Sequence, residues 1–137
     1  MPFDLTIVTP EGLAYQGSVE RVVLPGSEGD FGVLASHERF LSALRVGEVE
    51  IRATEDTLYA AIAGGFAEVD GDAVSVLVDS CELEHEIDAA RADAALIAAQ
   101  QALERAAGDK DPDRYRAFET ALDHARARVA VSQRSRK

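Results

Sequence analysis

The sequence predicts an α+β protein in which an N-terminal antiparallel β-sandwich is followed by a C-terminal antiparallel two-helix hairpin. Two observations support this prediction. Up to about residue 80, short runs rich in β-branched and aromatic residues alternate with turn residues. From Ile87 the chain becomes alanine-rich and holds no proline or glycine before Gly108. We therefore expect a sandwich domain over residues 1–84 and a helical hairpin domain over residues 85–137.

The expected strands are short runs that alternate apolar and polar side chains. They cover residues 3–8, 19–24, 49–53, 58–63, 66–69 and 73–78. Turn residues separate them, with Thr9-Pro10-Glu11-Gly12 after the first run and Gly64-Gly65 between two later ones. Asp70-Gly71-Asp72 between the last two runs is a strong hairpin signal. Closely spaced short strands of this kind are typical of an antiparallel sandwich or barrel.

Each expected helix carries its own start signal. Asp88 can cap the first helix, and Gly108 stands where a residue with positive φ would end it. The second helix begins with Asp111 as N-cap and Pro112 at the first helical position. One apolar stripe follows at helical spacing, formed by Phe118, Leu122, Ala125 and Val129. The short link between the helices favours an antiparallel hairpin.

The two helices are too small to form a core of their own, because alanine side chains bury little apolar surface. The hairpin must therefore pack against the sandwich, bind a partner, or move between such positions. This first inference about function follows from the size of the hairpin alone.

The composition excludes several classes of protein. With 47% hydrophobic and 28% charged residues among 137, the chain is typical of a soluble globular protein. Its net charge of -11 argues against general nucleic-acid binding. No apolar run approaches the roughly 20 residues that would cross a bilayer, and no signal peptide is visible. The single cysteine, Cys81, excludes an internal disulfide and a cysteine-cluster zinc site.

The stretch LPGSEGDFGVLASHERF at residues 24–40 invites three chemical interpretations. PGSEGDFG is not a Walker phosphate loop, because it lacks the closing Gly-Lys-Ser/Thr and contributes two acids that repel phosphate. Ser36-His37-Glu38 is not a hydrolase triad, since neighbours on an extended segment point to opposite faces. Metal binding by Glu28 and Asp30 stays open, although a turn with two acids is usually solvated.

The other two histidines do not form a site either. His85 and His124 lack metal-ligand spacing to a second histidine or to Cys81. No part of the sequence assembles a nucleophile, a base and a group that orients the base. We therefore expect no catalytic activity from the chain on its own, and we expect no cofactor.

Three segments together resemble the epsilon subunit of the F-type ATP synthase, called delta in mitochondria. They are LPGSEGDFGVLASH at 24–37, GGFAEV at 64–69, and IDAARA at 87–92, and the resemblance runs from end to end of the chain. The first segment is the most specific. It departs from the family pattern at Ala35-Ser36, where Pro-Gly is common, and at Arg39, where Pro often follows. These departures concern local turn geometry.

The resemblance implies a non-catalytic rotor subunit in the central stalk of a proton-translocating ATP synthase. Such a subunit binds the gamma subunit on one side and the c-ring on another, with the alpha and beta subunits as further partners. The segment of the chain that would contact the c-ring comprises Ser27, Glu28, Gly29, Asp30 and His37. The location implied is peripheral, on the cytoplasmic side of a bacterial inner membrane.

The helical tail is where the family varies. In some members it extends along gamma and blocks ATP hydrolysis, and in others it folds down and binds ATP. The resemblance implies this ATP-binding set: Ile87, Asp88, Arg91, Ala92, Arg126 and Arg128. A structural explanation is equally complete, because Asp88 can cap the helix and pair with Arg91 at i+3. His124 stands where the second helix of the family often has arginine.

Two alternatives to a rotor subunit belong to other functional classes. The first is a free-standing ATP-sensing module that uses the helical hairpin as a ligand clamp, which the small set of arginines disfavours. The second is a small sandwich hydrolase, which the missing catalytic constellation disfavours.

Overall fold

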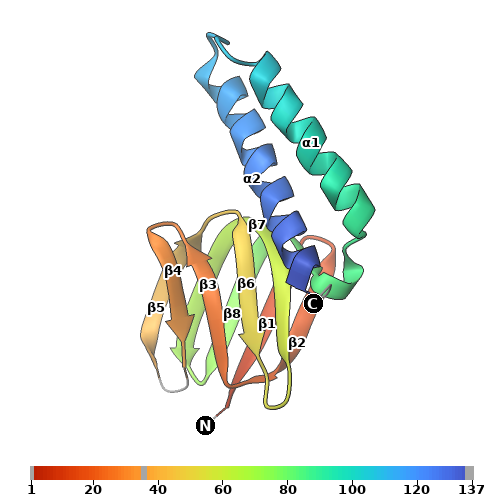
Figure 1. Ribbon diagram of the computed structural model, residues 1–137. Helices are drawn as coiled ribbons and strands as arrows, with labels where there is room; N and C mark the ends of the chain where they lie inside the picture. The colour runs from red at the N-terminus through yellow and green to blue at the C-terminus, as the bar shows by residue number, and fades with distance from the viewer. Residues whose placement is uncertain (1, 35–36, 135–137) are drawn as a thin grey trace.

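The computed structural model describes residues 2–34 and 37–134, and it confirms the predicted α+β fold (Figure 1). The strands are β1 (Phe3–Thr9), β2 (Gly12–Val19), β3 (Arg21–Gly26), β4 (Gly29–Val33), β5 (His37–Leu44), β6 (Gly47–Arg52), β7 (Thr57–Gly71) and β8 (Ala73–Leu83). A short 3-10 helix, η1 (Glu84–Glu86), leads into α1 (Ala89–Arg105) and α2 (Pro112–Arg134).

The strands form one continuous sheet that folds over into two layers. Neighbouring strands follow the order β2-β1-β8-β7-β5-β3-β4, and β6 pairs with both β3 and β7. One pairing differs from the antiparallel rule, since β1 runs parallel to β8 with Leu5 opposite Val74. Alternate side chains of both layers meet in a fully buried core that includes Leu5, Ile7, Leu24, Ile51, Ile62 and Val76. This core makes the sandwich a rigid platform for the surfaces described below.

Strand β7 is a single long strand, although the sequence predicted a break at Gly64-Gly65. The glycines allow close backbone contact instead of a turn: a Cβ on Gly65 would lie 2.0 Å from the carbonyl oxygen of Leu77. A Cβ on Gly64 would lie 2.9 Å from the carbonyl oxygen of Leu44. β7 pairs with β6 up to Ile62 and with β5 from Gly65 onward, so it changes its partner at these glycines. The glycine pair therefore marks the place where β7 passes from one layer to the other.

The helices begin where the capping residues predicted. The Asp88 carboxylate accepts a hydrogen bond from the backbone N–H of Arg91 at 3.1 Å. The Asp111 carboxylate accepts from the N–H groups of Asp113 and Arg114 at 3.0 and 3.3 Å. Gly108 has a φ of 87° in the link between the helices, which residues other than glycine rarely adopt.

The hairpin is attached to the sandwich mainly through the end of α2, which contacts β6 and β7, and through η1, which contacts β7. The remainder of the two helices extends away from one end of the sandwich (Figure 1). A small apolar cluster secures the junction, formed by Ala61, Ile87, Ala92, Ala127 and Val131. Of the three arrangements expected from its size, the hairpin therefore adopts the one in which it packs against the sandwich.

Candidate functional site

The β3–β4 hairpin forms an exposed tip made of Ser27, Glu28, Gly29 and Asp30. Gly26 pairs with Gly29, which leaves Ser27 and Glu28 as the two turn residues. A Cβ on Gly26 would lie 2.6 Å from the carbonyl oxygen of Gly29, and Gly29 has a φ of 135°. These glycines therefore shape a tight turn that presents Glu28 to solvent.

The tip is held against β5. The backbone N–H of Ser27 donates to the carbonyl of Ala43 at 3.0 Å, and the guanidinium of Arg45 forms an ion pair with Asp30. Asp30 is therefore engaged within the protein, whereas Glu28 projects from the turn. His37 begins β5 opposite Gly71, but its side chain lies outside the described residues, as do Ala35 and Ser36.

Four apolar residues form a row across neighbouring strands on the outer face of the sheet, which we call the apolar row. Val8 of β1 lies opposite Leu77 of β8, and Leu77 lies opposite Phe66 of β7. Phe66 in turn lies opposite Ala43 of β5. Phe66 is 55% exposed and Leu77 54%, and Leu41 beside them is 68% exposed. Large apolar side chains at this exposure would be stabilised by burial against another protein.

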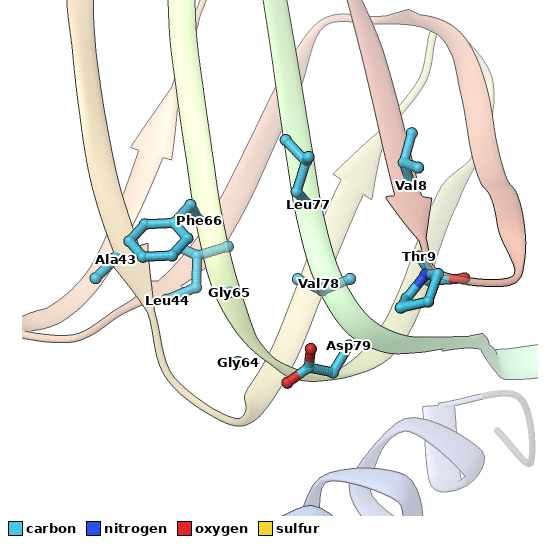
Figure 2. Close-up of a pocket in the computed structure, with 11 residues that line it drawn as sticks. Val8, Thr9, Ala43, Leu44, Gly64, Gly65, Phe66, Leu77, Val78 and Asp79 are labelled. Carbon is cyan, nitrogen blue, oxygen red and sulfur yellow. The ribbon is translucent and has the colours of Figure 1, made fainter.

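The apolar row borders an open hollow of about 650 Å³ at one end of the sandwich (Figure 2). Its lining also includes Thr9, Gly64 and Asp79. The next row along the same face is polar on β1, β8 and β7, where Thr6, Ser75 and Glu68 lie side by side. It is apolar only on β5, where Leu41 lies opposite Glu68. An apolar patch with a polar border is typical of a protein-interaction surface.

A signal for this surface is present in the sequence. In FAEV, Phe66 shares its strand face with Glu68, while Ala67 and Val69 point into the core. In SVLVD, Leu77 shares its face with Ser75 and Asp79. A large apolar residue in phase with polar neighbours indicates an apolar side chain on the outer face, and our sequence interpretation overlooked it.

The residues of the expected ATP-binding set have structural contacts in this conformation. Ile87 and Ala92 are buried in the junction cluster. Asp88 caps α1, and the Arg91 guanidinium lies 4.0 Å from its carboxylate with 85% of the Arg91 side chain exposed. Each member of the IDAARA motif that the resemblance singled out thus contributes to the start of α1 or to the attachment of the hairpin.

The two supporting arginines lie in different environments. Arg128 forms a two-pronged ion pair with Glu82, with Nε and Nη2 at 2.7 and 3.5 Å from the two carboxylate oxygens. Arg126 lies 3.9 Å from Asp123 and lines a separate cleft between α2 and the β5–β6 turn, near Arg45. Arg91 is not among the residues that line this cleft. ATP binding by the set of six stays a prediction.

His124 of α2 lies in an unfavourable environment near this junction. Its Nε2 is buried and makes no hydrogen bond to any described residue. Burial lowers the pKa of His124, and the nearby Arg128 guanidinium lowers it further, while Glu82 acts in the opposite direction. Protonation of His124 is therefore less favourable in the folded protein than in the unfolded chain.

The free energy of unfolding is expected to fall as the pH drops from 7.5 to 5.5. The unfolded chain takes up a proton at the ordinary histidine pKa of 6.5, whereas folded His124 takes it up at a lower pH. The stability that neutral His124 contributes is therefore fully present above its pKa in the unfolded chain. It is lost as the pH falls through the pKa of His124 in the folded protein. Urea denaturation at pH 7.5 and at pH 5.5 measures the difference in the free energy of unfolding. His124→Gln should make that difference smaller.

His85→Gln, which replaces an exposed histidine of η1, is the matched control for this measurement. A change in pH dependence that His85→Gln reproduces in full would contradict the assignment to His124. An unfolding free energy that falls equally with pH in the unsubstituted chain and in His124→Gln would contradict the assignment to His124.

The described residues show no arrangement specific to catalysis. Burial, Glu86 and Glu82 raise the pKa of the Cys81 thiol to about 11, so thiolate is scarce at neutral pH. Among the side chains that the structure describes, those of residues 2–34 and 39–134, no cluster of three or more His, Cys, Asp or Glu is suited to a metal ion. Among the helices described, none combines the length and apolarity needed to cross a membrane.

Comparisons with known proteins agree in their result. Residues 2–84 match the family model described as ATP synthase, Delta/Epsilon chain, beta-sandwich domain. The ATP synthase epsilon chain of Synechococcus sp. (strain WH7803) is 39% identical over 134 residues, which cover 97% of this chain and 98% of that one. The epsilon chain of Syntrophobacter fumaroxidans is 42% identical over 131 residues, covering 96% of each chain.

Solved structures show the same fold. A chain of the Euglena gracilis mitochondrial ATP synthase, in a structure of OSCP, F1 and the c-ring, superposes with a TM-score of 0.78 at 25% identity. The match covers 94% of this chain and 80% of that one. A chain from the central stalk and c-ring structure of the Tetrahymena thermophila enzyme matches with a TM-score of 0.56 at 13% identity, which shows a similar fold alone.

Proposed function

Since the chain belongs to the delta/epsilon family of ATP synthase subunits, we propose that it links the gamma subunit to the c-ring in the central stalk. In this role it is a non-catalytic rotor subunit that transmits torque as a rigid body. The continuous sheet with its fully buried core supports such a role, because a closely packed interior deforms little under load. The subunit is then a peripheral component on the cytoplasmic side of a bacterial membrane, as its bacterial relatives suggest.

The observation that carries the proposal is the apolar row, which we assign to the gamma subunit. Phe66 and Leu77 are each more than half exposed and stand on adjacent strands of a rigid sheet. Their burial would contribute a hydrophobic interface core, and the polar row beyond them would form its rim. A patch of this kind suits a permanent partner, such as another subunit of the rotor.

The exposed tip is assigned to the c-ring. Glu28 projects from a tight turn that Gly26 and Gly29 permit and that the hydrogen bond from Ser27 to Ala43 holds against β5. A carboxylate on a rigid turn can meet polar and basic loops of the ring, and such complementarity sets register more than affinity. His37 is retained in this assignment on the resemblance alone.

The hairpin is assigned a regulatory role in ATP hydrolysis. It contacts the sandwich mainly through the end of α2 and through η1, and most of both helices extends beyond the sandwich. The extended part is free to act on the alpha and beta subunits of the same enzyme. ATP as a ligand of the hairpin stays a proposal that calorimetric titration of the subunit with ATP tests.

The substitution Glu28→Lys is expected to lower the coupling of ATP hydrolysis to proton pumping by about two-fold or more, because it reverses a charge that faces the ring. The assay is ATP-driven acidification of inverted membrane vesicles containing the whole enzyme, divided by the hydrolysis rate. Glu28 is preferred over Asp30, whose replacement would also break the ion pair with Arg45.

The control is Glu55→Lys, an exposed acid in the turn between β6 and β7. That turn lies at the opposite end of the sandwich from the tip, since Arg52 pairs with Arg21 at the start of β3. Equal coupling in Glu28→Lys and Glu55→Lys would remove the tip from the ring contact, while leaving the family assignment intact.

A further inference from the structure

A small acidic pocket lies where the end of α2 meets the sandwich. It has a volume of about 200 Å³ and is lined by Val23, Asp30, Glu48, Glu50, Tyr59 and Arg134. Five of these residues belong to β3, β4, β6 and β7, and only Arg134 comes from α2. The sandwich therefore supplies an acidic, aromatic pocket, and the helix supplies the cation that fills it.

Arg134 is bound in this pocket by two kinds of contact. Its Nε lies 2.7 Å from Oε1 of Glu48, and its Cζ lies 4.5 Å from the centroid of the Tyr59 ring. The side chain of Glu48 is 26% exposed and that of Arg134 40%. The hydrogen bond to Glu48 raises the pKa of Arg134, as expected for a cation held by a carboxylate. An aromatic face together with a carboxylate at its edge matches a planar guanidinium better than an ammonium group.

The pocket keeps its shape through contacts that do not involve Arg134. The hydroxyl of Tyr59 donates to Oε1 of Glu50 at 3.3 Å, and the backbone N–H of Tyr59 donates to Glu84 at 3.2 Å. Glu48 and Glu50 stand on β6, which pairs with β7 along its whole length. Asp30 forms an ion pair with Arg45, and Glu48 is the carboxylate that forms an ion pair with Arg134. Removal of Arg134 would therefore leave a preformed site with an excess of negative charge.

We propose that Tyr59, Glu48 and Glu50 form a guanidinium-binding site, which Arg134 fills here and which otherwise accepts an arginine side chain of another protein chain. The site is independent of the apolar row and of the assignment to the rotor. Arg134 in the last turn of α2 therefore competes with the arginine of a partner for the same pocket. Lysine is a poor substitute, because its ammonium group offers no planar surface to stack on the ring.

The test uses the full chain with Arg134→Ala, which empties the pocket while the hairpin stays attached. Attachment is maintained by the Arg128–Glu82 ion pair and by the buried cluster that includes Ile87 and Val131. N-acetyl-arginine amide is added while the ring signals of Tyr59 are followed by NMR, with Tyr59→Phe used to assign them. We expect saturable shifts with a dissociation constant on the order of 10 mM, and about ten-fold weaker binding of N-acetyl-lysine amide.

Arg126→Ala is the matched control, because Arg126 lies two turns earlier on α2 and pairs with Asp123 instead of the pocket. Neither this variant nor the unsubstituted chain should show the shifts, since Arg134 still fills the site. If Arg134→Ala does not fold, Arg134→Lys is used instead. The new lysine keeps a positive charge in the pocket, and the arginine amide should displace it from there.

Three results would overturn the proposal. One is the absence of saturable shifts in both Arg134 variants. The second is equal binding of the arginine and lysine amides, which would indicate general attraction between charges. The third is unchanged binding when Glu48→Gln is added to Arg134→Ala, because the carboxylate would then have no part in recognition.

Discussion

Replacement of Leu77 by glutamate is expected to weaken binding to the gamma subunit by about 100-fold while the sandwich stays folded. Leu77 is 54% exposed in the isolated subunit, so a charge there remains hydrated and costs little stability. In the proposed interface the same carboxylate would be buried beside Phe66 and Val8 without a partner. Burial of an unpaired polar group costs about 3 kcal/mol, which corresponds to roughly 100-fold in affinity.

Binding is measured by titrating the subunit onto a purified ATP synthase core that lacks it. Ser75→Glu is the matched control, since Ser75 lies two residues earlier on the same strand and face, in the polar row. Ser75→Glu should weaken the affinity by less than about five-fold, as is usual for a substitution at an interface rim. Equal affinities of Leu77→Glu and the unsubstituted chain would exclude the apolar row from the gamma contact.

Replacement of Gly65 by alanine is expected to destabilise the sandwich by about 3 kcal/mol or more. The new Cβ would lie 2.0 Å from the carbonyl oxygen of Leu77 and 2.8 Å from Cα of Val78. Both atoms belong to the backbone of β8 and cannot move aside as a flexible side chain would. Relief requires separation of β7 from β8, the strand that β7 pairs with along most of its length.

Urea denaturation of Gly65→Ala and of the unsubstituted chain measures the loss in the free energy of unfolding. Gly71→Ala is the control, because Gly71 has a φ of 62° at the β7–β8 turn and a Cβ there would meet no atom within 4 Å. That substitution should cost only the backbone strain of the left-handed region, about 1 kcal/mol. A loss at Gly65 no larger than the loss at Gly71 would show that the two strands can separate without disrupting the core.

The family and the general architecture could be predicted from the sequence. The resemblance carried by the segments at 24–37, 64–69 and 87–92 is confirmed by the family match and by the epsilon chains of two bacteria. The helix starts at Asp88 and Asp111 were predicted correctly, since capping depends on residues within one helical turn. The β7–β8 hairpin was predicted for a similar reason, because Asp70-Gly71-Asp72 is a local turn signal.

Several strands could not be predicted in the same way. β2 is an edge strand with one fully buried side chain, so its sequence lacks the alternation of a strand that covers a core. β5 has Phe40 and Leu41 adjacent and both at the surface, which obscures its alternating pattern. The parallel pairing of β1 with β8 joins residues about seventy positions apart, for which no local pattern exists.

The apolar row and the acidic pocket are the features on which local sequence patterns give the least information. Capping residues, turn glycines and the alanine-rich helices act on neighbours a few positions away, and they specified each element and the order of the elements. The apolar row needs four strands in one register, and the Arg134 pocket brings together Glu48, Tyr59 and a residue 86 positions after Glu48. Such juxtapositions depend on how β7 passes between the layers and where α2 packs against them. Only the folded chain decides these, because long-range packing energies select among arrangements that local preferences leave equally open.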